Sequence, residues 1–205
     1  MPLYSTWEWI RSEYRQREPL FISDQSGTPY YCQYNYFLLS YLGVKYRVSF
    51  PEGSIKREKE ELPAASGLSP EEEILFLQYL CWARGLPPQE KWKSFLELPG
   101  GEHHNLPFQK EAIYPLARQY GEHISCFCHR GEQYGRRIQL GDAAFLLPVF
   151  PLINLAVVLW QGDEEFAPRA NVLFDSASPY HLPTASLYVL GIAVVRRIWE
   201  VEPTL

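Results

Sequence analysis

The chain has 205 residues, of which 46% are hydrophobic and 21% are charged, and its formal net charge is −5. This length and composition suit one domain with a substantial core and argue against disorder, so we expect residues 1–205 to form a single domain. The negative charge disfavours binding to a nucleic-acid backbone as the main activity.

No apolar run reaches the roughly 18–20 residues that a membrane-spanning helix needs. The start of the chain carries charges where a secretion signal needs an apolar centre. We therefore expect a cytoplasmic protein that neither spans a membrane nor binds nucleic acid. Its cysteines are expected to stay reduced, and they are Cys32, Cys81, Cys126 and Cys128.

The chain opens with a helix signal. Residues 3–18 carry apolar side chains at spacings of three and four residues, which predicts an amphipathic helix. Pro19 is expected to end that helix, and residues 23–29 have the composition of a turn.

An aromatic and β-branched stretch follows. We predict two antiparallel strands over about residues 30–41 and 44–50, with Gly43 at the turn. A short helix over 31–42 is the alternative, because this run is apolar enough that periodicity does not separate the two. Residues 51–68 are polar and predict a solvated connector.

The next helix has a clear start signal. Ser69 can cap it, Pro70 suits its first position, and the glutamates at 71–73 favour the positive end of the helix dipole. The helix is expected to continue to about Gly85. Since the dipole explains the three glutamates, we assign them no function.

The middle of the chain mixes short elements. Residues 91–98 predict a strand and residues 99–107 a loop. A helix is expected over 108–120, where Pro115 predicts a kink or a boundary, and another over 122–134.

The C-terminal part holds the strongest core signal. Residues 136–148 predict a short strand, a turn and a second strand. Residues 152–160 are apolar without alternation, which is typical of a central strand buried on both faces. A returning antiparallel strand is expected at 171–175, and residues 182–201 predict a final helix. The predicted fold class is therefore α+β: a mostly antiparallel sheet, with the strand near 152–160 at its centre and helices packed on it.

Carboxylates gather around the turn after the central strand. Asp163, Glu164 and Glu165 are consecutive, and Asp175 ends the returning strand. Close carboxylates can bind a hard cation or serve as acid and base. The plainer interpretation is that Asp163 caps the turn while both glutamates face water. Because adjacent side chains diverge, we expect one of Glu164 and Glu165 to face inward and the other to face solvent.

Two other groups could contribute chemistry. His103 and His104 lie in a glycine-rich loop, where imidazoles are accessible to a ligand, although adjacent histidines are not a standard chelating pair. Cys126 and Cys128 are followed by His129, but this spacing supplies at most half of a tetrahedral site. We therefore predict reduced thiols and no bound metal. Phosphate-binding, dinucleotide-binding and hydrolase motifs are missing from the sequence.

At this point a family resemblance emerges. WQGDEEF at 160–166 and NVLFDSASPYHLP at 171–183 resemble the signature of DUF3786, an uncharacterised family mostly from anaerobic bacteria and archaea. The resemblance covers about residues 30–200 and includes ELPGG, PLARQYG and GDAA. Ala167 stands where the family pattern has proline, and Ala185 where it has an acidic residue, which weakens a role for a carboxylate in the last helix.

The resemblance implies no mechanism. It favours a ligand-binding or accessory protein of anaerobic metabolism, and we expect an acidic and aromatic pocket near the GDEEF turn that takes a small molecule. The alternative is an enzyme that uses Asp163, Glu164, Glu165 and Asp175 with His103 or His104 as acid, base or metal ligands. A second alternative is a scaffold that binds a protein partner. The cofactor is not specified by the sequence.

Overall fold

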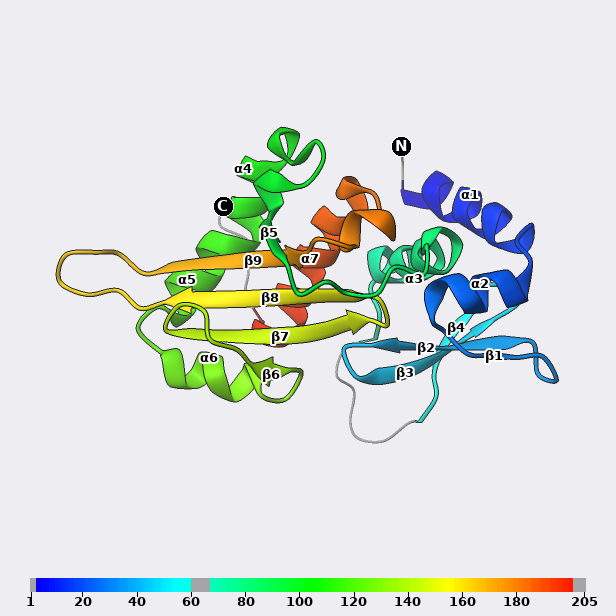
Figure 1. The fold of residues 1–205 in the computed structure, drawn as a ribbon, viewed down its shortest axis with the longest axis horizontal. Coiled ribbons are helices and arrows are strands. Elements are labelled where there is room, and N and C mark those ends of the chain that lie inside the picture. The colour runs from blue at the N-terminus through cyan, green and yellow to red at the C-terminus, as the bar shows by residue number, and fades with distance from the viewer. Residues whose placement is uncertain (1–2, 60–66, 201–205) are drawn as a thin grey trace.

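The structure, a computed structural model, describes residues 3–59 and 67–200 and confirms the α+β class (Figure 1). The helices are α1 (Leu3–Arg15), α2 (Pro19–Ser26), α3 (Pro70–Trp82), α4 (Asn105–Phe108), α5 (Tyr114–Tyr120), α6 (Ile124–Gly131) and α7 (Thr184–Trp199). The strands are β1 (Tyr30–Tyr31), β2 (Tyr36–Tyr41), β3 (Val44–Ser49), β4 (Ile55–Arg57), β5 (Trp92–Ser94), β6 (Arg136–Arg137), β7 (Ala143–Phe150), β8 (Ile153–Trp160) and β9 (Arg169–Asp175). Among the described residues, no helix combines the length and apolar character needed to cross a bilayer.

The strands form two antiparallel sheets. The larger sheet has the order β5-β9-β8-β7-β6, so β8 is its central strand as predicted. Residues 155–159 of β8 are fully buried on both faces. Val157 pairs with Phe145 on one side and Val172 on the other, and all three belong to the main core. Helices α5, α6 and α7 lie along one face of this sheet (Figure 1).

The smaller sheet has the order β1-β2-β3-β4 and confirms the predicted hairpin around Gly43, but a turn at 32–35 divides the strand predicted over 30–41 into β1 and β2. The hairpin between β2 and β3 turns at Leu42 and Gly43, which both have positive φ. Two consecutive positive φ values are typical of the tight hairpin turn that matches the strand twist. Buried residues alternate along β2, so one face of this sheet packs against the core.

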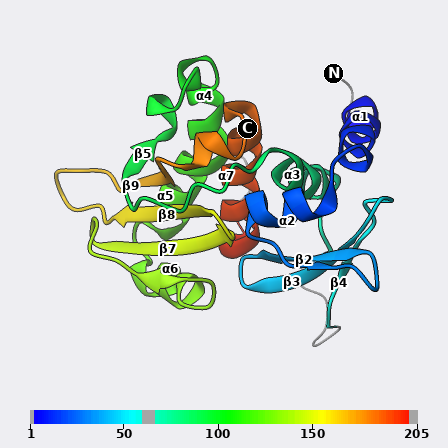
Figure 2. The ribbon, with the colours of Figure 1, turned by 45° about the vertical axis from the view of Figure 1, so that its right-hand side comes forward.

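Helix α3 packs against aromatic rings of both sheets, Tyr41 of β2 and Phe150 of β7. Its predicted start is confirmed: Ser69 and Glu72 form a reciprocal capping box, and proline occupies the first turn. Residues 74–81 are buried around the whole circumference, which is typical of a core helix. Tyr79 stacks on Phe150 of β7 at 4.6 Å between ring centroids, and its hydroxyl donates to the Ser26 carbonyl of α2. Figure 2 shows α3 above the smaller sheet and beside α7.

Three local predictions are wrong. Pro19 begins a second helix instead of only ending the first, because the Glu18 side chain caps the backbone N–H groups of Leu20 and Phe21. The connector at 51–68 contains strand β4, although residues 60–66 lie outside the described part. The strand at 91–98 is limited to β5, because Ser94 and Glu97 form a capping box that starts a 3₁₀ turn.

The segment before α5 is also more helical than predicted. Helical structure runs from α4 through a π-helical turn, Gln109–Ile113, into α5. Pro115 lacks an N–H group and its ring crowds the carbonyl four residues earlier. The wider π turn in this segment lets the chain continue as a helix through the proline instead of ending there.

Candidate functional site

The acidic loop, residues 162–166, lies at the end of the β8–β9 hairpin and extends beyond the sheet (Figure 1). Asp163 Oδ1 accepts hydrogen bonds from the backbone N–H groups of Glu165, at 2.9 Å, and Phe166, at 2.7 Å. The side chains of Glu164 and Glu165 are both exposed. The expectation that one of them faces inward is therefore wrong, because Asp163 alone satisfies the turn.

Asp175 lies at the opposite end of β9. The strand has 7 residues from Arg169 to Asp175, so at about 3.3 Å per residue Asp175 is roughly 20 Å from the hairpin end. Its buried carboxylate accepts hydrogen bonds from the backbone N–H groups of Gln89, Glu90 and Ala177. Asp175 thus holds the segment before β5 and does not join the acidic loop in one site.

His181 is a buried residue that the sequence analysis did not select. Its Nδ1 accepts from the backbone N–H of Arg84 at 3.3 Å, and its Nε2 lies 2.9 Å from the Leu86 carbonyl, to which it donates in that tautomer. Burial lowers the pKa of His181, so the ring stays neutral. Because both ring nitrogens are used by the backbone, His181 stabilises the 84–86 segment and is not a free general base. A histidine within the DSASPYHLP stretch was the available signal.

His103 and His104 are exposed. His103 Nε2 is 3.5 Å from Glu102, and the His104 ring lies 5.7 Å from that of Tyr188. Within the described chain, no hydrogen bond or ion pair joins either histidine to the acidic loop or to Asp175. The predicted acid and histidine candidates are thus distributed over separate places.

The cysteines lie in three separate parts of the fold: Cys32 between β1 and β2, Cys81 in α3, and Cys126 with Cys128 on α6. Cys126 is exposed and Cys128 half-buried on α6, while Cys81 is buried in α3. Burial raises the pKa of Cys81 to about 12, so its thiol remains protonated. Across residues 3–59 and 67–200, no three His, Cys, Asp or Glu side chains are grouped to hold a metal ion. The reduced, metal-free state of Cys126 and Cys128 stays a prediction.

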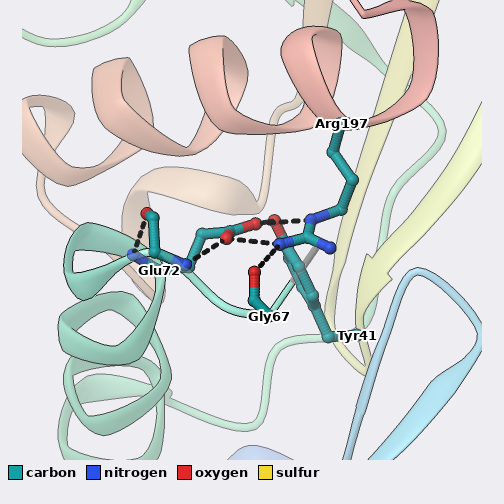
Figure 3. Close-up of polar contacts among 5 residues, drawn as sticks. Tyr41, Gly67, Glu72 and Arg197 are labelled. Carbon is teal, nitrogen blue, oxygen red and sulfur yellow. Dashed lines mark hydrogen bonds and ion pairs between the residues drawn. The ribbon is translucent and has the colours of Figure 1, made fainter. Parts of the chain in front are cut away.

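A deeply buried ion pair joins α3 to α7, and we call it the Glu72–Arg197 clamp (Figure 3). Arg197 Nε donates to Glu72 Oε1 at 2.7 Å, and its Nη2 donates to the other carboxylate oxygen. Tyr41 of β2 donates its hydroxyl to Glu72 Oε1 at 2.9 Å. Burial, followed by the Glu72 charge, raises the pKa of Tyr41 well above its usual value, so the hydroxyl remains a donor.

The clamp is structural, because its polar atoms are paired within the protein. Glu72 also accepts from the backbone N–H of Ser69, and Arg197 donates to the Gly67 carbonyl at 3.2 Å. The neighbouring Glu111 is likewise paired, with Arg196 at 3.0 Å and with the Tyr188 hydroxyl. The assignment of 71–73 to helix-dipole effects therefore missed the role of Glu72.

A hollow suited to a ligand lies beside the acidic loop, and we call it the hairpin groove. It has a volume of about 410 Å³ and runs between β9, the 94–96 segment and the π-helical region. Phe95 and Phe108 belong to its lining and stack at 4.5 Å between ring centroids. Tyr114 is 47% exposed and belongs to the same lining. Phe95 and Phe108 are buried in the floor of the groove, so Tyr114 is the ring that the groove exposes to a bound molecule.

Glycines shape the walls of the groove. Pro168, one of its lining residues, packs so closely on Gly162 and Gly121 that a Cβ would lie 2.7 Å and 2.1 Å from the proline ring. A Cβ on Gly101 would lie 2.0 Å from the Phe95 carbonyl oxygen. These contacts bring three stretches together at the hairpin groove: GDEEF (162–166), PLARQYG (115–121) and ELPGG (97–101).

The polar groups of the groove are three amides, two hydroxyl groups and the guanidinium of Arg169, which lies 5.9 Å from the centroid of the Trp160 ring. Gln109 Oε1 accepts from the Tyr114 hydroxyl at 2.7 Å, and Asn171 Oδ1 accepts from the backbone N–H of Val172. Within the described residues, the amide NH₂ groups of both side chains have no protein acceptor. No carboxylate, histidine, cysteine or lysine lines the groove. The expected acidic and aromatic pocket is thus an amide and aromatic groove in this structure.

These features define an α+β protein with two antiparallel sheets and an aromatic groove beside a hairpin loop. A family model described as a domain of unknown function, DUF3786, matches residues 18–197, and the chain belongs to this family. Comparisons with curated proteins and with solved structures found no match.

Proposed function

We propose that this protein binds a small, flat, uncharged heteroaromatic molecule in the hairpin groove. The observation that carries the proposal is the combination of the exposed Tyr114 ring with unpaired amide NH₂ groups in a hollow of about 410 Å³. Small-molecule sites are typically concave and apolar with a few placed polar groups, and they range over about 300–1,000 Å³. A flat heteroaromatic ring matches both features, because its faces stack and its edge accepts hydrogen bonds.

Binding fits this groove better than catalysis does. General acid–base chemistry needs a titratable group within hydrogen-bond reach of the substrate, and the titratable groups lining the groove are Tyr114 and Arg169. Ser94 Oγ donates to the Glu97 carboxylate at 2.6 Å, but this pair belongs to the capping box of the 3₁₀ turn and Glu97 does not line the groove. The enzyme alternative would instead need Asp163 and Asp175 to act together, from opposite ends of β9.

A protein partner is the second candidate for this surface. Leu96 and Tyr114 line the groove and are 53% and 47% exposed, and Phe166 of the acidic loop is 65% exposed. Exposed apolar side chains around a hollow are a feature of protein interfaces as well as of ligand sites. The ligand-binding proposal also includes a cytoplasmic location and a role in anaerobic metabolism, without binding of nucleic acid.

Calorimetric titration of the purified protein with adenine, uracil and lumichrome tests the proposal, because these uncharged rings differ in size. We expect at least one to bind with a Kd below 1 mM. Tyr114→Ala should weaken that binding about 5- to 150-fold, since one ring stacked on an aromatic side chain contributes about 1–3 kcal/mol. Gln109→Ala should weaken it as well.

Tyr34→Ala provides the matched control, because Tyr34 is 71% exposed and does not line the groove. This variant should bind like the wild type, and circular dichroism should show all variants folded. If no uncharged ring binds, or if Tyr34→Ala weakens binding as much as Tyr114→Ala, the groove is not a site for this class of molecule.

A further inference from the structure

A second and larger hollow lies between the N-terminal helices and the 179–183 segment. It has a volume of about 780 Å³, and we call it the arginine cleft. Its lining includes Arg17, Phe21, Trp82, Arg84, Tyr180 and His181. It shares no lining residue with the hairpin groove. What it binds is therefore a separate question from the proposed function.

The cleft is positive in a protein whose net charge is −5. Arg17 and Arg84 line it, and no carboxylate does. The Arg84 side chain is exposed and makes no ion pair with any described residue. Arg17 lies 3.9 Å from Glu13, and both side chains are more than one-third exposed, so this pairing is weak. Two guanidinium groups thus remain available to an anion.

Helix dipoles do not cancel this charge. Trp82 ends α3 and brings the negative end of that helix to the cleft, while Pro183 caps α7 and brings a positive end. The two half-charges oppose each other, because each helix end carries a partial charge of about 0.5 of opposite sign. The full charges of the two arginines therefore set the sign of the cleft.

Aromatic rings lie in the same cleft. Phe21 is 53% exposed and Tyr180 is 58% exposed, and Trp82 is half-buried. Exposed rings beside arginines give a surface on which a planar ring can stack while its charged substituent reaches a guanidinium group. An inorganic anion would use only the arginines, and a neutral ring only the aromatic side chains.

The wall of the cleft is suited to binding and not to reaction. His181 has both ring nitrogens engaged with backbone groups, as described above. Cys81 lines the cleft as a buried, protonated thiol. The same contacts hold Arg84 in place, because the backbone N–H of that residue donates to His181.

We infer that the arginine cleft binds a small aromatic anion, a planar ring that carries a carboxylate or phosphate group. The ring is recognised by Phe21, Trp82 and Tyr180, and the anionic group by Arg17 and Arg84.

Calorimetric titration of the full chain with adenosine monophosphate, flavin mononucleotide and 4-hydroxybenzoate tests this inference. At least one should bind with a Kd below 1 mM. Adenosine and inorganic phosphate, which each present one half of the chemistry, should bind at least tenfold more weakly than the best phosphate-bearing ring. Arg84→Gln and Arg17→Gln should each weaken binding of the aromatic anion at least tenfold.

Arg118→Gln is the matched control, because Arg118 is exposed on α5 and does not line the cleft. It should bind like the wild type, and so should Tyr114→Ala, which alters only the hairpin groove. The inference is overturned if none of the three aromatic anions binds. It is also overturned if adenosine binds the Tyr114→Ala variant, whose hairpin groove is altered, as well as its monophosphate does, or if Arg118→Gln weakens binding as much as Arg84→Gln. Failure of uncharged rings in the groove would leave these results unchanged, so the two proposals fail independently.

Discussion

Among single residues, Glu72 shows how burial changes the role of a charged side chain. It stands between Glu71, which is exposed, and Glu73, which is half-buried, whereas Glu72 itself is only 4% exposed. Its carboxylate joins three segments, since it accepts from Arg197 of α7, from Tyr41 of β2 and from the Ser69 backbone. Removing a buried carboxylate with this many partners is strongly destabilising, because its partners are left unpaired in the protein interior.

We expect Glu72→Ala to lower the free energy of unfolding by about 3–5 kcal/mol, because it leaves the Arg197 charge buried without its partner. Glu71→Ala is the control from the same helical turn and should change stability by no more than about 0.5 kcal/mol. Urea unfolding measures both. A loss below about 1 kcal/mol for Glu72→Ala would mean that Arg197 finds water or another acceptor.

His181 predicts a dependence of stability on pH. Burial lowers its pKa in the folded state from the usual 6.5. Below about pH 6.5 the unfolded chain takes up a proton that the folded chain does not, so stability falls as the pH falls, by up to about 1.4 kcal/mol per pH unit. Urea unfolding at several pH values between 5 and 8 should therefore show a smaller pH dependence for His181→Asn than for wild type. Equal slopes would show that His181 titrates alike in the folded and the unfolded chain, so that its pKa is not lowered by folding.

The sequence could predict only part of the site at this scale. It showed that Asp163 can satisfy its own turn, and the structure confirms that interpretation. Asp175 was grouped with the acidic loop although the predicted strand at 171–175 already separates the two, and the structure shows them at opposite ends of β9. The groove was harder still, since amides such as Gln109 and Asn171 carry no motif, and only the tertiary packing around Pro168 brings them together.

At the scale of elements, strand β8 was predictable because its apolar run has no alternation. Such a run needs cover on both faces, and residues 155–159 have it. The start of α3 was predictable because its capping box is local. Helix α2 was not, because Pro19 can either end a helix or begin one, and the capping by Glu18 depends on side-chain geometry. The π turn before Pro115 likewise has no sequence signal of its own.

Val157→Ala tests the central position of β8. Val157 is fully buried between Phe145 and Val172, so the change should lower the free energy of unfolding by about 1–3 kcal/mol through lost burial and a residual cavity. Val44→Ala, at the half-buried start of β3, should cost less. The strand would be peripheral to the core if both substitutions had equal effects in urea unfolding.

For the whole molecule, the question is whether two sheets make one cooperative unit. The two sheets are joined by several kinds of contact. The backbone N–H of Leu42, which follows β2, donates to the Val149 carbonyl of β7 at 3.1 Å. Phe150 of β7 lies 5.2 Å from the Tyr41 ring and 5.5 Å from the Phe76 ring of α3. The Glu72–Arg197 clamp adds a polar link through Tyr41. One continuous core of this kind predicts a single unfolding transition.

Phe127→Leu distinguishes one unit from two. Phe127 is fully buried at the far end of the larger sheet, where it stacks on Trp199 at 4.9 Å and lies 5.7 Å from the Phe145 ring. If the chain unfolds as one unit, the substitution should lower amide-exchange protection by the same free energy in β8 and in β2, although β2 does not contact Phe127. Hydrogen-exchange mass spectrometry in low denaturant measures the two strands separately. Loss of protection in β8 with β2 unchanged would show that the two sheets unfold independently, and residues 1–205 would then comprise two folding units instead of the single domain we expect.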